Sequence, residues 1–456
     1  MRPTRSQRRA TLCAVALAVA FAPAAHAADS LIDTIVAEIS AERIEARIRK
    51  LASFGTRHSL SETESETRGI GAARRYIASE LSACSRESGG RLEVTLDEFV
   101  AEPSRRIPTP TTLVNVVATL PGTQAESRGR VYVVSGHYDS RASDVMNAEI
   151  DAPGANDDAS GTAASMELAC VMARHRFDAT LVFLAVAGEE QGLLGATHWA
   201  EQASERGISV AAMLTDDIIG SPRAADGRVA ADRVRLFAEG VPATRELSDE
   251  LRVRISTGGE NDLPTRQLAR FIVAAAERHV PAMTVDMIYR RDRYLRGGDH
   301  IPFLERGIPA VRFTEPYEDY RHQHQDLRTE GGIAYGDLPE LVDFEYVANV
   351  TRVNAAALAT LALAPAAPTG VQIEVQQLEN DTTLRWDPSP EPDVAGYRVV
   401  WRDTTAARWE HSRDVGKVTR HTMTGLSKDD YLFGVTAVDA DGNESVASAP
   451  VPFRGE

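Results

Sequence analysis

Lysine and long hydrophobic runs are scarce in this chain of 456 residues. Lysine occurs only as Lys50, Lys417 and Lys428, so nearly all of the positive charge is arginine, which we attribute to genomic bias rather than to chemistry. After residue 27, no stretch has the roughly 18 consecutive apolar residues that a membrane-spanning helix requires. We therefore expect a soluble mature protein with no spanning membrane segment.

Positive charge is also in the minority. Asp and Glu number 66 against 50 for Lys and Arg, which gives a formal net charge of -16. This charge argues against a nucleic-acid-binding surface, so we expect no nucleic acid among the partners. The chain is 43% hydrophobic and 25% charged, which is an ordinary globular composition, and its length favours two or more domains.

The N-terminus has the three parts of a signal peptide. A basic segment from Arg2 to Arg9 precedes an unbroken apolar run from Leu12 to Phe21. Pro23 and the small residues of Ala25-His26-Ala27 follow, where a signal peptidase would cleave. We therefore predict a signal peptide over residues 1–27 and export to the periplasm or the extracellular space.

The chain has 3 cysteines, and Cys13 would leave with the signal peptide. An oxidising compartment permits a bridge between the other two, Cys84 and Cys170. Cys170 lies on an apolar helical face, however, and this favours a buried free thiol. Both states remain open from the sequence, with the free thiol preferred.

Residues 28–364 alternate apolar runs with segments of helical period. The runs that read as buried strands are 113–120, 131–134, 180–187, 210–214, 234–238 and 310–313. The segments with helical period are 162–174, 193–203, 263–279 and 344–363. This alternation predicts an α/β fold with a mostly parallel central sheet covered by helices on both faces.

An Ala/Pro-rich linker over residues 362–369 predicts a domain boundary near residue 365. Residues 365–456 then have short alternating strands divided by Pro, Gly, Asp and Asn, which is typical of an all-β sandwich. The motifs Leu384-Arg-Trp-Asp-Pro and Gly396-Tyr-Arg-Val, and Tyr431 further on, resemble a fibronectin type III domain. The resemblance implies a core tryptophan at Trp386. We expect an accessory module that contacts a surface, a polysaccharide or a protein.

Polar side chains that can bind metal follow five of the predicted strands or lead into the helix beyond them. They are His137 and Asp139, Asp157 and Asp158, Glu189 and Glu190, Asp216 and Asp217, and His322 to Asp326. Taken alone, each of these elements is better explained as a helix cap, a solvated turn or a surface histidine. In open α/β sheets, however, functional groups gather at the carboxyl ends of the strands. Two histidines and three carboxylates placed there can hold two cations with one carboxylate between them, as in a two-metal hydrolase.

These motifs, in this order, resemble the co-catalytic zinc aminopeptidases, a metallopeptidase family that also holds glutamate carboxypeptidases and glutaminyl cyclases. The matching segments are His137-x-Asp139, Gly154-Ala-Asn-Asp-Asp-Ala-Ser-Gly161, Gly188-Glu-Glu190, Asp217-Ile-Ile-Gly220 and His322-x-x-x-Asp326. The resemblance covers roughly residues 30–364 and implies a zinc exopeptidase-like fold.

The resemblance also implies a role for each site residue. His137 and Asp217 would bind one zinc ion, Glu190 and His322 would bind the other, and Asp157 would bridge the two. Glu189 would be the general base, and Asp139 would accept a hydrogen bond from His137. The Asp157–Asp158 peptide bond would be cis.

Some assignments leave a neighbour open. His322 is preferred over His324 because of its four-residue spacing to Asp326, and Asp217 is preferred over Asp216 because it directly precedes Ile-Ile-Gly. Asp299 and His300 match the family too, and we expect them to shape the pocket rather than bind metal. Tyr294 is a candidate neighbour of the developing oxyanion.

The expected function is therefore that of an exported aminopeptidase with two Zn²⁺ per chain, acting on peptides. It would hydrolyse the N-terminal peptide bond through metal-activated water and the general base Glu189. The alternatives on the same fold are a glutaminyl cyclase, suggested by the segment Asp299-His-Ile-Pro-Phe-Leu, and a glutamate-type carboxypeptidase. A catalytically silent binding protein is the alternative from another class, and the complete set of ligand positions argues against it.

Overall fold

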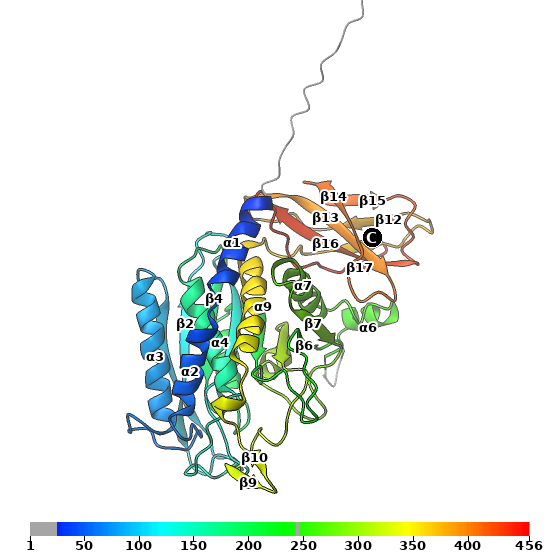
Figure 1. The fold of residues 1–456 in the computed structure, drawn as a ribbon. Helices are drawn as coiled ribbons and strands as arrows, with labels where there is room; N and C mark the ends of the chain where they lie inside the picture. The colour runs from blue at the N-terminus through cyan, green and yellow to red at the C-terminus, as the bar shows by residue number, and fades with distance from the viewer. Residues whose placement is uncertain (1–24, 243–246, 456) are drawn as a thin grey trace, which may run out of the picture.

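The computed structural model describes residues 25–242 and 247–455 (Figure 1). They form a large α/β domain followed by a smaller all-β domain. The expected signal peptide, residues 1–27, lies outside the described residues except for Ala25 to Ala27, which begin helix α1 (Ala25–Glu38). In the described part of the chain, no helix is both long and apolar enough to cross a membrane.

An eight-stranded sheet forms the centre of the large domain. Its strands are β1 (Glu93–Ala101), β2 (Thr111–Leu120), β3 (Arg130–His137), β4 (Thr180–Val186), β5 (Ser209–Asp216), β6 (Arg233–Ala238), β7 (Thr284–Ile288) and β8 (Ala310–Thr314). Their spatial order is β1-β2-β4-β3-β5-β8-β6-β7. The central strands β4, β3, β5 and β8 are parallel to one another, and so are β6 and β7. The antiparallel pairs are β1/β2, β2/β4 and β8/β6, so the predicted parallel sheet is confirmed for the centre and becomes mixed at the flanks.

Helices cover both faces of this sheet, as predicted. Besides α1 they are α2 (Ala41–Ala52), α3 (Gly69–Glu87), α4 (Ala159–Met172), α5 (Leu194–Glu205), α6 (Asp249–Ser256), α7 (Pro264–His279), α8 (Ile301–Glu305), the 3-10 helix η1 (Pro339–Leu341) and α9 (Phe344–Leu363). Neighbouring residues of β3 show the division, because successive side chains of a strand point to opposite faces. Val134 belongs to the core that includes Leu168 of α4, whereas Val133 belongs to a separate core with Phe303 of α8.

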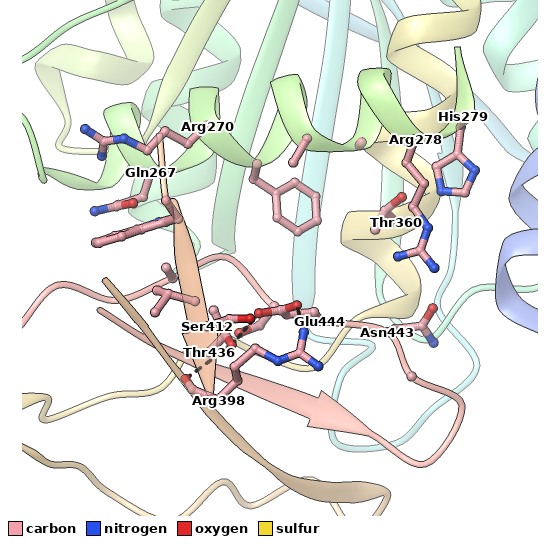
Figure 2. A pocket seen from close by; sticks show the side chains of 18 of the residues that line it. Gln267, Arg270, Arg278, His279, Thr360, Arg398, Ser412, Thr436, Asn443 and Glu444 are labelled. Atoms are coloured by element: carbon pink, nitrogen blue, oxygen red, sulfur yellow. Dashed lines mark hydrogen bonds and ion pairs between the residues drawn. The ribbon is translucent and has the colours of Figure 1, made fainter. Parts of the chain in front are cut away.

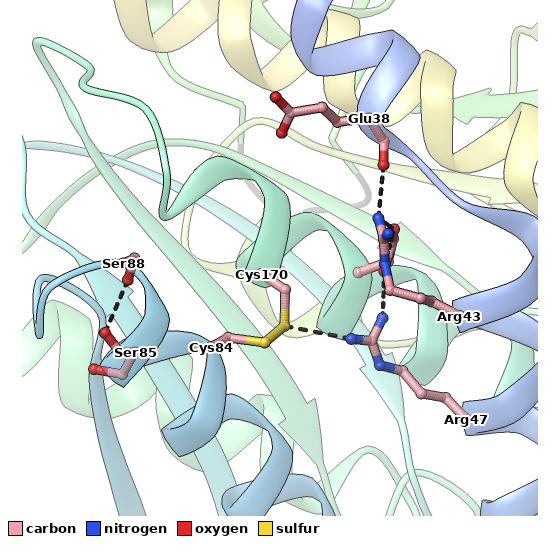
Figure 3. Close-up of a disulfide and its surroundings, with 8 residues drawn as sticks. Glu38, Arg43, Arg47, Cys84, Ser85, Ser88 and Cys170 are labelled. Atoms are coloured by element: carbon pink, nitrogen blue, oxygen red, sulfur yellow. Dashed lines mark hydrogen bonds and ion pairs between the residues drawn. A yellow bond between two sulfur atoms is a disulfide. The ribbon is translucent and has the colours of Figure 1, made fainter.

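The two cysteines of the large domain form a disulfide bond, so the preference for a buried free thiol was wrong. Cys84 lies on α3 and Cys170 on α4, with their Cα atoms 5.1 Å apart (Figure 3). Arg47 of α2 donates a hydrogen bond to the sulfur of Cys170 over 3.4 Å. Sequence periodicity marks the apolar face of α4 but does not reveal which helix packs on that face. The packing of α3 against α4 decided the outcome.

The smaller domain is a β-sandwich, as the resemblance to fibronectin type III predicted. A four-stranded sheet in the order β15-β12-β11-β17 packs on a three-stranded sheet in the order β14-β13-β16. The strands are β11 (Gln372–Glu374), β12 (Thr382–Arg385), β13 (Val394–Asp403), β14 (His411–Gly416), β15 (Arg420–Met423), β16 (Tyr431–Asp439) and β17 (Val451–Phe453). Trp386 lies buried in the core between the sheets, with its ring 5.4 Å from that of Tyr397.

The sandwich is docked on the large domain through buried charges. Both carboxylate oxygens of Asp262, just before α7, accept hydrogen bonds from Arg402 of the sandwich, at 2.8 and 3.0 Å. Arg270 of α7 also donates to Asp262 and, over 2.8 Å, to the backbone oxygen of Ala407. A cavity of about 330 Å³ lies between α7 and the sandwich strands. Figure 2 shows the side chains that line it from both domains. The second domain is therefore held to the large domain by buried hydrogen bonds and ion pairs in addition to the linker.

A short hairpin of β9 (Arg328–Glu330) and β10 (Ile333–Tyr335) completes the large domain. Figure 1 shows this hairpin at the end of the molecule opposite the sandwich. The loop after β8, which leads into the hairpin, carries the last of the five predicted motifs.

Candidate metal centre

The segments that follow the parallel strands bring all five motifs to one edge of the sheet. His137 is the last residue of β3, Glu189 and Glu190 follow β4, and Asp217 follows β5. The chain returns from β3 toward α4 through Asp157. Because the carboxyl ends of parallel strands meet at the same edge, residues far apart in the sequence become neighbours here.

Two groups of three potential ligands form at this edge. One is His137, Asp157 and Asp217, and the other is Asp157, Glu190 and His324. In each group, one ligand atom per residue lies within 4.8 Å of the others. Asp157 belongs to both groups: its Oδ1 is 3.2 Å from Nε2 of His137, and its Oδ2 is 2.9 Å from Nε2 of His324. The resemblance implied a shared position of this kind for Asp157.

The histidine of the second group is His324, so the preference for His322 is corrected by the structure. Nε2 of His324 lies 3.0 Å from Oε1 of Glu190. His322 instead turns toward Asp319, with its Nδ1 4.0 Å from Oδ2 of that residue. His324 has a left-handed backbone conformation with a φ of 56°. Spacing along the sequence fixes neither this turn nor the direction of the imidazole.

Asp139 connects His137 to the paired glutamates. Nδ1 of His137 lies 3.2 Å from the backbone oxygen of Asp139 and 3.5 Å from its Oδ1. The carboxylate of Asp139 accepts hydrogen bonds from the backbone nitrogens of Glu189 and Glu190 at 3.3 and 3.1 Å. Burial opposes the charge of Asp139, but His137 and these donors hold its pKa below the usual value. The side chain therefore stays ionised and fixes both the imidazole and the loop after β4.

Glu189 stands beside the two groups without belonging to either. Burial raises its pKa well above the usual value, and repulsion from Asp217 and Glu190 adds to this effect against the attraction of His137. A carboxylate with a raised pKa is a stronger base than an ordinary glutamate. This is the property that a general base for neutral pH requires.

The backbone around Asp157 is fixed by residues that the sequence did not single out. Asp337, in the loop after β10, accepts hydrogen bonds from the backbone nitrogens of Asn156 and Asp157 at 2.8 and 2.7 Å. Gln323 donates to Oδ2 of Asp157 over 3.0 Å. The Asp157–Asp158 peptide bond is cis, as the resemblance implied. No local pattern marks Asp337, because its role arises only from the fold.

Asp158 caps helix α4 and supports β3 at the same time. Its Oδ1 accepts from the backbone nitrogen of Gly161 over 2.9 Å, and its Oδ2 accepts from that of His137 over 3.0 Å. The helix-cap explanation therefore applies to Asp158, while its neighbour Asp157 faces the histidines.

The geometry favours Asp217 over Asp216, as the preference from the sequence did. Asp217 belongs to the first group of ligands. Asp216 points to the helical layer, where Asn354 of α9 donates a hydrogen bond to its Oδ1 over 2.9 Å. Burial raises the pKa of Asp216 to about 8, which is consistent with a carboxyl held away from solvent.

Asp299, His300 and Tyr294 lie outside both groups. Asp299 is buried, and burial raises its pKa to about 7, with repulsion from Asp217 and Asp139 opposing the attraction of His137. His300 is buried too, with its Nε2 2.8 Å from the backbone oxygen of Arg291. Tyr294 is 80% exposed and contacts Arg290, so the structure does not bring it to the site.

The donor set fits zinc. Imidazole nitrogen and carboxylate oxygen are ligands that Zn²⁺ accepts readily in proteins. His137 is held from its Nδ1 side, which leaves its Nε2 facing Asp157 and the ligand group. Histidine ligands of metals are commonly held in this way through their second nitrogen.

Comparison with known proteins agrees with this chemistry. The model for peptidase family M28 matches residues 115–332, and that for the fibronectin type III domain matches residues 366–454. A probable zinc metalloprotease of Pyrenophora teres f. teres is 50% identical over 416 residues, which span 91% of this chain and 86% of that protein. One from Leptosphaeria maculans is 50% identical over 415 residues, spanning 91% and 95%.

Solved structures share the fold at low sequence identity. LapB from Legionella pneumophila superposes with a TM-score of 0.53 at 18% identity, covering 73% of this chain and 75% of that one. An aminopeptidase from Aneurinibacillus sp. strain AM-1 has a TM-score of 0.51 at 16% identity, covering 73% and 96%.

Proposed function

Because this chain belongs to peptidase family M28 and is a zinc metallopeptidase, we propose that it is an exported aminopeptidase that uses two zinc ions per chain. The observation that carries the proposal is the position of Asp157, whose two carboxylate oxygens face His137 on one side and His324 on the other. A carboxylate shared in this way is the arrangement that two neighbouring divalent cations require. His137 and Asp217 would hold one ion, and Glu190 and His324 the other.

The bound ions would polarise the scissile carbonyl and lower the pKa of the attacking water. Glu189 takes a proton from that water and returns it to the leaving amine. Burial raises the pKa of Glu189 above its usual value, which makes its carboxylate a stronger proton acceptor. Asp139 keeps the backbone of Glu189 and the ring of His137 in place through its hydrogen bonds.

The substrate specificity separates the proposal from its alternatives. An aminopeptidase cleaves aminoacyl amides with a free α-amine, a glutaminyl cyclase acts on N-terminal glutamine, and a glutamate-type carboxypeptidase acts on acidic C-termini. We expect the purified protein to release p-nitroaniline from aminoacyl p-nitroanilides. The same preparation should be assayed with a glutaminyl peptide and a peptide ending in glutamate. Turnover of either of these without aminoacyl hydrolysis would replace the proposal with that alternative.

Metal content gives a second test of the proposed function. Elemental analysis of the active protein should find about two zinc ions per chain, and a chelator should abolish activity that added zinc restores. Full activity with one bound zinc ion would count against the two-zinc proposal.

Export is part of the same proposal. The disulfide between Cys84 and Cys170 supports it, because such bonds persist in oxidising compartments. Expression in a bacterial host should yield a mature protein that begins at Ala28 and is recovered from the periplasm or the medium. N-terminal sequencing checks the cleavage site, and an intact N-terminus in the cytoplasm would exclude it. We also propose that the sandwich contacts a surface, a polysaccharide or a protein.

A further inference from the structure

Arg312 is a buried cation beside one of the two ligand groups. It lies on β8, where its backbone pairs with Thr215 of β5, and its side chain is fully buried. Nη2 of Arg312 is 2.9 Å from Oδ1 of Asp217 and also donates to the backbone oxygen of Asp217 over 3.2 Å. A proposed metal ligand thus forms an ion pair within the protein.

The same guanidinium also pairs with a second carboxylate. Nη1 of Arg312 donates to Oδ2 of Asp292 over 3.2 Å and to the backbone oxygen of Gly297 over 2.6 Å. A Cβ atom at Gly298 would stand 2.9 Å from this Nη1 and 3.0 Å from Oδ2 of Asp217, so a larger residue at this position would push the guanidinium or the carboxylate aside. The position of the guanidinium is therefore fixed by contacts on several sides.

The carboxylates of the second ligand group have no such partner, and the half-buried Arg106 reaches only the backbone oxygen of Glu190, over 2.6 Å. Glu190 and Asp157 face the imidazole of His324, and Asp157 also faces His137. Over residues 25–242 and 247–455, no arginine or lysine other than Arg312 forms an ion pair with a carboxylate of either group. The two groups therefore differ in one buried positive charge.

We propose that Arg312 makes the two metal positions unequal, so that the position with Asp217 binds its zinc ion more weakly than the position with Glu190 and His324. This inference rests on the two-zinc function proposed above. A guanidinium remains charged at all relevant pH values, and it repels a nearby dication. Its hydrogen bond also occupies an oxygen of Asp217 that would otherwise be available to the metal. A histidine ligand is strengthened by the acceptor that its second nitrogen faces, whereas the carboxylate ligand Asp217 accepts from a cationic donor, which draws negative charge away from the metal.

The test is a zinc titration of the full-length, metal-stripped protein against a competing chromophoric chelator. We expect two steps whose dissociation constants differ by about tenfold or more, which is the scale on which such partners change metal affinity. In Arg312→Gln the weaker step should tighten by about tenfold while the tighter step stays in place. In Arg312→Lys the charge is kept, so the weaker step should remain weak.

Two further variants complete the test, one with an expected effect on zinc binding and one as a control. Asp292→Asn removes the competing carboxylate and leaves Arg312 to Asp217 alone, so the weaker step should weaken further. Arg47→Gln removes another buried arginine, which pairs with Glu167 between α2 and α4. Neither zinc step should move in that control, and circular dichroism checks that each variant is folded.

Equal zinc steps in the wild-type protein would overturn the inference, as would equal tightening in Arg312→Gln and Arg312→Lys. If Arg312→Gln does not fold, the Asp292→Asn variant becomes the deciding measurement. An unchanged affinity of its weaker zinc step would then overturn the inference. A single zinc ion in the wild type but two in Arg312→Gln would support it. One zinc ion in both would overturn it together with the two-zinc proposal. Two unequal steps in a protein without aminopeptidase activity would defeat only the proposed activity.

Discussion

At the scale of single residues, the site depends on which atom of each side chain faces the centre. The adjacent residues Glu189 and Glu190 are both held by Asp139 through their backbone nitrogens, yet only Glu190 lies against His324. Two neighbouring carboxylates of the same type thus occupy different places. Their substitution should separate catalysis from metal binding.

Glu189→Gln keeps the size of the side chain but cannot accept a proton. We expect kcat to fall by roughly 10²–10⁴-fold, the contribution of general acid–base catalysis, with the zinc content unchanged. Glu190→Gln removes an anionic ligand and should instead lower the zinc content. Steady-state kinetics and elemental analysis on both variants provide the measurement. Metal loss in Glu189→Gln together with intact zinc in Glu190→Gln would reverse the two roles.

The two candidate histidines offer a matched pair. His324→Ala should weaken zinc binding and remove most activity, because its imidazole faces both Asp157 and Glu190. His322→Ala should keep the zinc content and most of the activity, since His322 turns to Asp319. Zinc titration of the two variants checks the assignment. The reverse outcome would restore the residue that the sequence favoured.

At the scale of elements, strands with both faces buried were the most predictable. Every residue of β4 is buried, and its continuous apolar run marked it as a central strand. The edge strand β1 was not predicted, because most of its side chains are partly or fully exposed and it gains its place by pairing with β2. Helices such as α9 were predicted within a few residues, since one face of them repeats with helical period.

The link between α3 and α4 should contribute to stability. The disulfide closes a loop between positions 86 residues apart, and removing such a bond typically costs about 2–4 kcal/mol, chiefly through the greater freedom of the unfolded chain. We expect the variant with Cys84→Ser and Cys170→Ser to unfold at lower denaturant concentration with its zinc content preserved. Urea unfolding of the oxidised and the reduced wild type provides the control. Equal unfolding midpoints for the oxidised wild type and the double variant would contradict the expectation.

At the scale of the whole molecule, buried ion pairs connect the sandwich to the large domain. Asp262 lies between Arg402 and Arg270, and all three side chains are at most 4% exposed. Arg130 of β3 similarly pairs with the buried Glu391 of the sandwich. Truncation near residue 365 would leave Asp262 without Arg402 and Arg130 without Glu391. We therefore expect the large domain alone to be less stable than the whole chain.

A single substitution tests this interface. Asp262→Asn leaves two buried arginines without their counter-charge, and breaking a buried pair in this way costs about 3–5 kcal/mol. Glu277→Gln is the control, because it removes a solvent-exposed pair with Arg408 across the same interface and should change stability little. Thermal unfolding of both variants gives the comparison. Similar melting temperatures for Asp262→Asn and the wild type would mean that the buried pair does not stabilise the interface.

The sequence by itself determined the chemistry of this protein. Apolar runs ending in His137, Glu190 and Asp217 predicted both a parallel sheet and a metal site at its edge, because the ends of parallel strands must converge. The tertiary structure alone decided that His324 faces the site, that Asp337 holds the backbone of Asp157, and that Arg312 pairs with Asp217. It also decided the disulfide and the docking of the sandwich. These features depend on the direction of side chains and on contacts between distant segments, which residue type and spacing do not fix.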